Sequence, residues 1–150
     1  MLADSLLLPE CVYRPGSFSG LMLLYESNYL KLHGLIGDLD TNTTHWISRA
    51  RRDSDLILER TRAEPYTTSL SMTYWLRDSE GIEIKDPDMS IRIYHDASVV
   101  EVLTCRASHR HHRLREIGRS HTRELSRRWR VNMMLNKWLD YLLESGHGFV

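Results

Sequence analysis

Apolar and polar positions alternate strictly over residues 66–76, which read YTTSLSMTYWL. A period of two places alternate side chains on opposite faces of a strand, so this run predicts a strand with one buried and one largely wet face. Turn residues separate similar runs that predict strands over 43–51, 56–63, 89–94 and 98–105. Five strands joined by short connections predict an antiparallel meander. The predicted buried face of the 66–76 strand holds Tyr66, Thr68, Leu70, Met72, Tyr74 and Leu76.

Helical spacing of apolar residues replaces this alternation on both sides of the strands. Residues 17–37 predict an amphipathic N-terminal helix that begins after a serine cap and ends at Gly34 or Gly37. A longer C-terminal helix is predicted to start between residues 117 and 123 and to end at Ser145. Without βαβ alternation, the pattern predicts an α+β fold in which this helix packs on the five-stranded antiparallel sheet. The predicted buried positions are Leu21, Leu24, Tyr25, Asn28, Leu32 and Leu35 in the first helix and Leu125, Val131, Met134, Leu135, Trp138, Tyr141 and Leu142 in the second.

Composition places the chain among ordinary globular domains. Its 150 residues are 41% hydrophobic and 27% charged, which predicts a single domain over residues 1–150, with 1–16 irregular or mobile. No apolar run approaches the roughly 20 residues that span a bilayer, and the N-terminus lacks the basic start and long apolar core of a signal peptide. Cys11 and Cys105 show no CxxC spacing, so we expect reduced thiols in the cytoplasm and no contact with a membrane.

Charge is balanced overall but unevenly placed. Residues 106–130 hold nine Arg and two Glu, whereas residues 78–88 are rich in Asp and Glu. If the basic segment is helical, a spacing of four places one row of guanidinium groups on a single face, which suits phosphate contacts. The two segments can equally pair with each other or be solvated, and the chain has no recognised nucleic-acid motif. A nucleic acid or other polyanion is therefore possible but not favoured, and the residues of the row are Arg115, Arg119, Arg123 and Arg127.

Four segments in this order resemble one known family. They are LLYESNYLKL (23–32), YTTSLSMTYW (66–75), MSIRIYHDASVVEV (89–102) and NKWLDYLLESG (136–146). The set is similar to the bacterial domain-of-unknown-function family 1249, the YqiB-like proteins, and the similarity extends from about Phe18 to Gly146. It implies a small cytosolic bacterial protein and no assigned activity. The first 17 residues and the density of Arg and His between 106 and 130 depart from the family pattern.

The most chemically suggestive residues are His95 and Asp96, at the bend between two predicted strands. With Glu101 they are candidates for acid–base or metal catalysis. Adjacent residues of a regular strand point apart, however, and Asp and Ser near a bend favour turns, so we favour a structural role for His95 at the hairpin. A polar cluster that binds a ligand without catalysis is the alternative. Its candidate residues are Glu26, Asn28, Tyr94 and His95.

A second histidine group is the weak metal candidate. His109 and His111 alternate on the chain and would share a face if extended, but Arg residues flank them and oppose a bound cation. We therefore predict no metal site and no cofactor.

Three functions follow from these features. The favoured one is a non-catalytic accessory or regulatory module that binds a protein or a small ligand. The alternatives are an enzyme centred on Tyr94, His95, Asp96 and Glu101, and a polyanion binder that uses the basic segment. The sequence leaves the oligomeric state and the ligand open.

Overall fold

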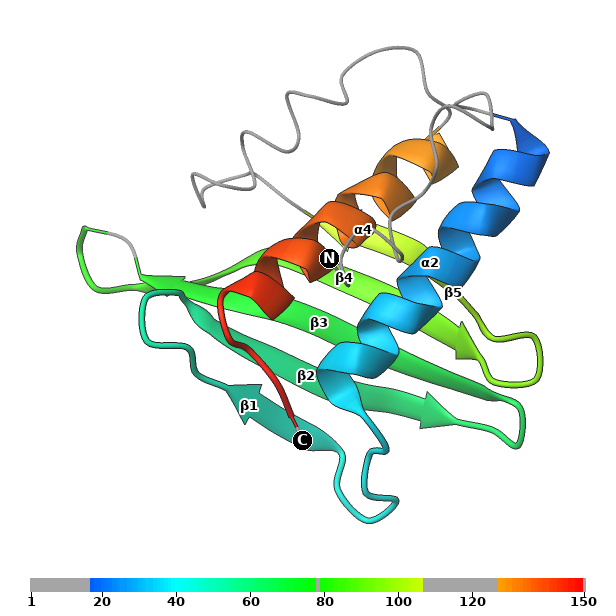
Figure 1. The fold of residues 1–150 in the computed structure, drawn as a ribbon. Helices are drawn as coiled ribbons and strands as arrows, with labels where there is room; N and C mark the ends of the chain where they lie inside the picture. Colours follow the sequence, from blue (N-terminus) through cyan, green and yellow to red (C-terminus); the bar gives the residue numbers. More distant parts are fainter. Residues whose placement is uncertain (1–16, 78, 107–126, 150) are drawn as a thin grey trace.

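A computed structural model describes residues 17–77, 79–106 and 127–149. The described elements are α2 (Phe18–Ile36), β1 (His45–Ser48), β2 (Asp55–Ala63), β3 (Thr67–Arg77), β4 (Glu83–Tyr94), β5 (Val99–Arg106) and α4 (Arg127–Glu144). The five strands form one antiparallel sheet in the order β1-β2-β3-β4-β5. Both helices lie on the same face of this sheet (Figure 1). The predicted α+β fold, with its meander and its C-terminal helix on the sheet, is confirmed.

The helix boundaries follow from local chemistry. Ser17 caps α2 by accepting a hydrogen bond from the Gly20 amide at 3.1 Å. The helix ends at Gly37, whose φ of 58° lies in the left-handed region and whose amide bonds the His33 carbonyl at 2.8 Å. The predicted serine cap and the Gly37 end are therefore confirmed. The part of the predicted C-terminal helix before Arg127 lies outside the described residues.

The predicted start of the fourth strand at residue 89 is wrong, because several of the acidic residues before it already belong to that strand. Strand β4 begins at Glu83, and residues 83–85 and 88 pair with β3 on the two sides of a register shift. The register extends because Ile84 pairs with Leu76, while the carboxylate of Asp88 accepts a hydrogen bond from Thr73 at 3.0 Å. The hydrogen bond from Thr73 thus stabilises the Asp88 carboxylate within a strand, although an acidic composition alone favours a loop.

The core lies between the sheet and the two helices. The alternation of β3 is confirmed at Leu70, Met72 and Tyr74, which are fully buried, although Tyr66 at the strand's start is 68% exposed. The predicted helix face of α2 is buried at all six of its positions, and Trp138 of α4 is buried at the centre of the cluster. Packing of these faces fixes both helices over the same side of the sheet.

A buried row of polar side chains joins the two helices. Lys31 of α2 is 1% exposed, forms an ion pair with Asp140 of α4 at 2.7 Å and donates to the side-chain oxygen Oδ1 of Asn136 at 2.9 Å. The side-chain amide of Asn136 donates to the Asn28 oxygen at 3.0 Å, and the Asn28 amide donates to the Asn132 carbonyl at 3.2 Å. Because each of these groups has a partner, the row fixes the register of α2 against α4.

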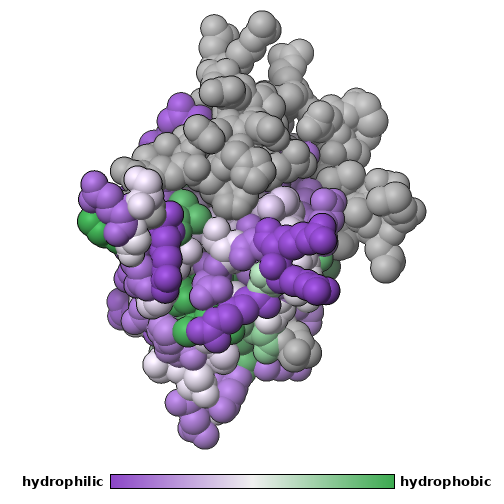
Figure 2. All heavy atoms as spheres, turned by 90° about the vertical axis from the view of Figure 1, so that its left-hand side faces the viewer, coloured by the Kyte–Doolittle hydropathy of each residue, from purple (hydrophilic) through white to green (hydrophobic). Residues whose placement is uncertain are grey.

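The end of the sheet that carries the β1–β2 and β3–β4 turns presents mostly hydrophilic residues (Figure 2). Small apolar areas are scattered among them without merging into one large patch. Exposed arginines of the β1–β2 turn, Arg51 and Arg52, belong to this end. The other end of the sheet, with the β2–β3 and β4–β5 turns, instead contains a cavity.

Candidate ligand-binding site

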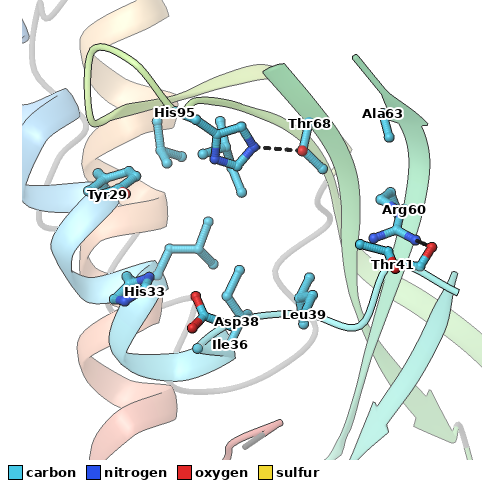
Figure 3. Close-up of a pocket in the computed structure, with 14 residues that line it drawn as sticks. Tyr29, His33, Ile36, Asp38, Leu39, Thr41, Arg60, Ala63, Thr68 and His95 are labelled. Atoms are coloured by element: carbon cyan, nitrogen blue, oxygen red, sulfur yellow. Dashed lines mark hydrogen bonds between the residues drawn. The ribbon is translucent and has the colours of Figure 1, made fainter. Parts of the chain in front are cut away.

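A cavity of about 340 Å³ opens at the end of the sheet where β3 begins and β4 ends. It lies between α2, the α2–β1 loop and the inner face of the strands (Figure 3). Its volume falls in the lower part of the range of small-molecule sites. The polar lining residues are Tyr29, His33, Asp38, Thr41, Arg60, Thr68 and His95, and the others are Leu32, Ile36, Gly37, Leu39, Ala63, Ile93 and Val100.

The cavity exists because α2 ends before the strands do. After Ile36 the chain leaves the helix through Gly37 and runs across to β1, and the cavity lies between this loop, the last turns of α2 and the strand ends at Thr68 and Ile93 (Figure 3). The floor is nonetheless apolar, since Ile93 and Val100 are buried members of the core cluster. The result is a hollow with an apolar floor and a polar rim.

Arg60 holds the α2–β1 loop in place at one side of the cavity. Its guanidinium donates to the carbonyl oxygens of Asp40, Thr41 and Thr43 at 3.2, 2.8 and 2.7 Å. The same group lies 5.5 Å from the ring centre of Trp46, within cation–π range. One strand side chain therefore orders the loop backbone, and three of its five N–H donors are engaged in doing so.

His95 faces this cavity. It continues the inward alternation of Ile91 and Ile93 beyond the end of β4, and its backbone amide bonds the Tyr66 carbonyl at 2.9 Å. Its Nε2 lies 2.7 Å from the Thr68 hydroxyl, and Nδ1 therefore points away from Thr68 (Figure 3). The imidazole is exposed rather than buried, so it both ties the two hairpins together and presents a polar atom to the cavity.

The opposite wall belongs to α2. Tyr29 and His33, one turn apart, stack with their ring centres 6.1 Å apart and their planes 9° apart. Asp38 follows the helix end, and its exposed carboxylate has no hydrogen bond or ion pair with the described residues (Figure 3). The His33 imidazole and the Asp38 carboxylate have no hydrogen bond with the described residues, whereas Tyr29 also packs against the core.

The other residues singled out from the sequence do not join His95 there. Tyr94 leaves the opposite face of β4 and donates to Glu101 at 2.5 Å, and neither residue lines the cavity. Asp96 is exposed in the β4–β5 turn, where its carboxylate accepts from the Ala97 amide at 3.0 Å. Burial and the hydrogen bond to Glu101 raise the pKa of Tyr94. The candidate catalytic set is thus divided between two faces of the sheet and a turn.

The two candidates on α2 lie elsewhere as well. Glu26 is exposed and does not line the cavity, whereas Asn28 is fully buried in the polar row between the helices. Of the basic row, Arg127 is exposed at the start of α4, and its three companions lie outside the described residues. The histidines His109 and His111 lie outside them too.

A second group of catalytic-looking residues meets at the opposite end of the sheet. Nδ1 of His147 lies 3.0 Å from the Ser48 hydroxyl, and its Nε2 lies 2.9 Å from an Asp53 carboxylate oxygen. A carboxylate accepts hydrogen bonds, so Nε2 carries the proton of this imidazole. Asp53 also accepts from Tyr74 at 2.6 Å and from Tyr141 at 3.4 Å. Serine, histidine and aspartate are therefore linked in a chain, as in hydrolases.

Burial gives this second group a structural role. The side chains of His147 and Asp53 are 0% and 2% exposed, and the Gly148 amide donates to the Ser48 hydroxyl at 3.0 Å. The serine oxygen thus has partners on both sides and no open space for a substrate. Burial, followed by the hydrogen bond to Asp53, raises the pKa of Tyr74. The cluster fastens the segment after α4 to β1 and to the β1–β2 turn.

Metal binding finds no support in residues 17–77, 79–106 and 127–149. These ranges contain no group of three or more His, Cys, Asp or Glu side chains placed to hold an ion. Cys105 is a free, half-buried thiol whose pKa burial raises to about 11, and the nearby Asp86 adds to that rise. A thiol in this state is a poor nucleophile at neutral pH.

Of the polar residues around the cavity, His95 alone stands out in the sequence. Arg60 and Thr68 carry a usable signal, because each sits in phase with buried residues of its own strand. A polar side chain at an inward position marks a place where the core ends. His33 and Asp38 give no such signal, since their approach to the sheet depends on where α2 stops.

Comparison with known proteins assigns the chain to a family. The sequence profile of a family described as a protein of unknown function (DUF1249) matches residues 31–148. This range covers more than half of the chain and includes the five strands, α4 and most of the cavity. The chain belongs to the DUF1249 family. Comparison with curated proteins gives no match, and comparison with solved structures gives none either.

Membership of DUF1249 confirms the resemblance carried by the four quoted segments, and it brings no activity with it. Within the described residues, neither α2 nor α4 combines the length and the apolar character needed to cross a bilayer.

Proposed function

We propose that this DUF1249 chain is a cytosolic, non-catalytic module that binds a small organic molecule in the cavity between α2 and the sheet. The observation that carries the proposal is the coincidence of a 340 Å³ hollow, an apolar floor and polar groups that the fold leaves unused. Ile93 and Val100 supply the floor, and the unused groups are the His33 imidazole, the Asp38 carboxylate and the ring nitrogen of His95 that does not face Thr68.

The apolar floor provides affinity and the polar rim provides orientation. Burying a ligand's apolar surface contributes roughly 25 cal/mol per Å², before the cost of immobilising the ligand is subtracted. Arg60 has already ordered the α2–β1 loop, so binding does not require the loop to fold first. A preformed rim of this kind lowers the entropic cost of binding.

The candidate catalytic set named from the sequence is not brought together at the cavity, which favours binding over catalysis. His95 is the one member of the candidate set Tyr94, His95, Asp96 and Glu101 that lines the cavity. The reduced, poorly nucleophilic Cys105 lies elsewhere in the sheet and adds no alternative nucleophile there.

A fluorescence titration tests this function. The probe is 1-aminoanthracene, an apolar fluorophore that is uncharged at neutral pH and brightens in apolar surroundings. We expect saturable brightening with the wild-type protein and at least a five-fold weaker response with Ala63→Trp, which fills the cavity mouth. Ala50→Trp, the same change in the turn at the other end of the sheet, is the matched control and should bind like wild type. Equal binding by both variants, or no saturable binding by wild type, would overturn the proposal.

A further inference from the structure

The charge around the cavity is negative on the side of α2. Asp38 lies directly after the helix end, and its carboxylate has no partner among the described residues. The C-terminal end of a helix carries a partial negative charge, which adds to the field of the carboxylate. Asp40, two residues further on, differs because it accepts from the Asn42 amide at 3.0 Å and from the Thr43 hydroxyl at 3.1 Å. Those two hydrogen bonds lower the pKa of Asp40 and leave Asp38 as the unused carboxylate.

The positive charge of Arg60 lies across the cavity and does not cancel the negative charge at the α2 wall. Arg60 is the one Lys or Arg among the lining residues, and it stands across the cavity from His33 (Figure 3). Its donors are directed to three loop carbonyls and its face to Trp46. At the β2–β3 turn beyond it, Arg62 pairs with Glu64 at 2.6 Å.

Three kinds of group at the α2 wall therefore recognise the same ligand chemistry. The Asp38 carboxylate attracts a positive charge, and an uncharged imidazole at His33 has one nitrogen that accepts a hydrogen bond. The stacked rings of Tyr29 and His33 add an aromatic face, which favours a nearby cation. An anionic ligand would meet repulsion from Asp38 and from the helix end instead.

We infer that the ligand class of this cavity is an organic amine with an apolar body, an inference that rests on the proposed function. The ammonium group lies against Asp38 and the Tyr29–His33 pair, and the apolar body lies over Ile93 and Val100. The carboxylate selects the charge, and the core residues select the size and shape of the body.

Three probes with the same phenylethyl body separate the alternatives: phenethylamine, 2-phenylethanol and 3-phenylpropionate. Each is titrated into ¹⁵N-labelled full-length protein at pH 8, and dissociation constants come from the backbone amide shifts of lining residues. We expect phenethylamine to bind about five-fold more tightly than 2-phenylethanol, the ratio that about 1 kcal/mol from one exposed ion pair gives. The propionate should bind more weakly than either, and 0.5 M salt should reduce the advantage of the amine.

Two variants assign this preference to the carboxylate. Asp38→Asn should bring phenethylamine to the affinity of 2-phenylethanol and leave the alcohol unchanged. Asp96→Asn, which removes an exposed carboxylate that does not line the cavity, is the matched control and should keep the five-fold preference.

The outcomes distinguish the inference of an amine ligand from the proposed binding function. Equal or tighter binding of the alcohol or the acid at the lining residues would overturn the amine inference and leave the binding function standing. A preference for the amine that survives in Asp38→Asn would also overturn it. The absence of shifts at lining residues with all three probes would overturn both the inference and the proposed function.

Discussion

The two ends of the sheet gather the same kinds of side chain and use them differently. At one end, Asp53, His147 and Ser48 are buried and bonded to one another, so the cluster is closed. At the other end, Asp38 and His95 face a cavity with polar atoms to spare. A set of histidine, aspartate and hydroxyl groups is therefore no evidence of function by itself. Accessible atoms that the fold does not use are what mark a candidate site.

The largest expected effect comes from removing the carboxylate at the closed end, and removing the one at the open end should change the stability little. Asp53→Ala leaves the hydroxyl of Tyr74 and the imidazole of His147 buried without their acceptor, which should lower the free energy of unfolding by about 3 kcal/mol. Asp38→Ala removes an exposed group that has no partner among the described residues, and it should change the free energy of unfolding by less than about 0.5 kcal/mol. Urea denaturation measures both, and similar losses for the two variants would erase the distinction between closed and open ends.

Lys31 tests whether burial, rather than residue type, decides how much a charged side chain contributes to stability. It lies in the row between the helices, and burial lowers its pKa more than Asp140 restores it. Lys31→Ala should lower the free energy of unfolding by about 2 kcal/mol, because Asp140 and Asn136 lose a buried partner. Lys137→Ala, on the same helix pair but not in the row, is the control and should cost much less. If the loss of unfolding free energy at Lys31 is no larger than that at Lys137, the buried polar row does not contribute the expected stability.

Alkaline pH should weaken the closed end. The pKa of Tyr74 is raised in the folded chain, so above pH 10 the unfolded chain releases a proton that the folded chain keeps. The stability that Tyr74 contributes is therefore complete below pH 10 and falls above it, by up to about 1.4 kcal/mol per pH unit. In Tyr74→Phe this part of the decline should disappear. The exposed Tyr66→Phe is the control, and if it flattens the profile as much as Tyr74→Phe, the closed cluster is not the source.

A small effect is also expected at His95. Its side chain is exposed and has one hydrogen bond, to Thr68, so His95→Ala should lower the free energy of unfolding by no more than about 1 kcal/mol. Thr68→Val removes the same bond from the other side, and the double variant should add little to either single change. A loss of several kcal/mol at His95 would assign it to architecture and take it out of the binding site.

The fold was predictable because its signals are local. A period of two gave β3 its buried Leu70, Met72 and Tyr74, and the cap at Ser17 and the stop at Gly37 set the limits of α2. The first half of β4 was missed because acidic composition favours a loop when the pairing with β3 is unknown. In this segment, pairing with β3 outweighs the low strand propensity of the acidic residues.

The sites were less predictable because they depend on distance in space. Ser48 and His147 are 99 residues apart in the sequence, and no spacing rule brings them together. The cavity depends on how far α2 extends over the sheet and on Arg60 reaching three carbonyls of the α2–β1 loop. His95 could be singled out as a residue, but its partner Thr68 comes from a strand 27 residues earlier.

The most direct test of the difference between the two ends is an amide-shift titration with the uncharged probe 2-phenylethanol. The expected result is saturable shifts at Leu39, Thr68 and His95 around the cavity, with the amides of Asp53 and His147 unmoved. Shifts concentrated at Asp53 and His147, or spread evenly over both ends without saturation, would contradict the claim that the open end alone accepts a small molecule.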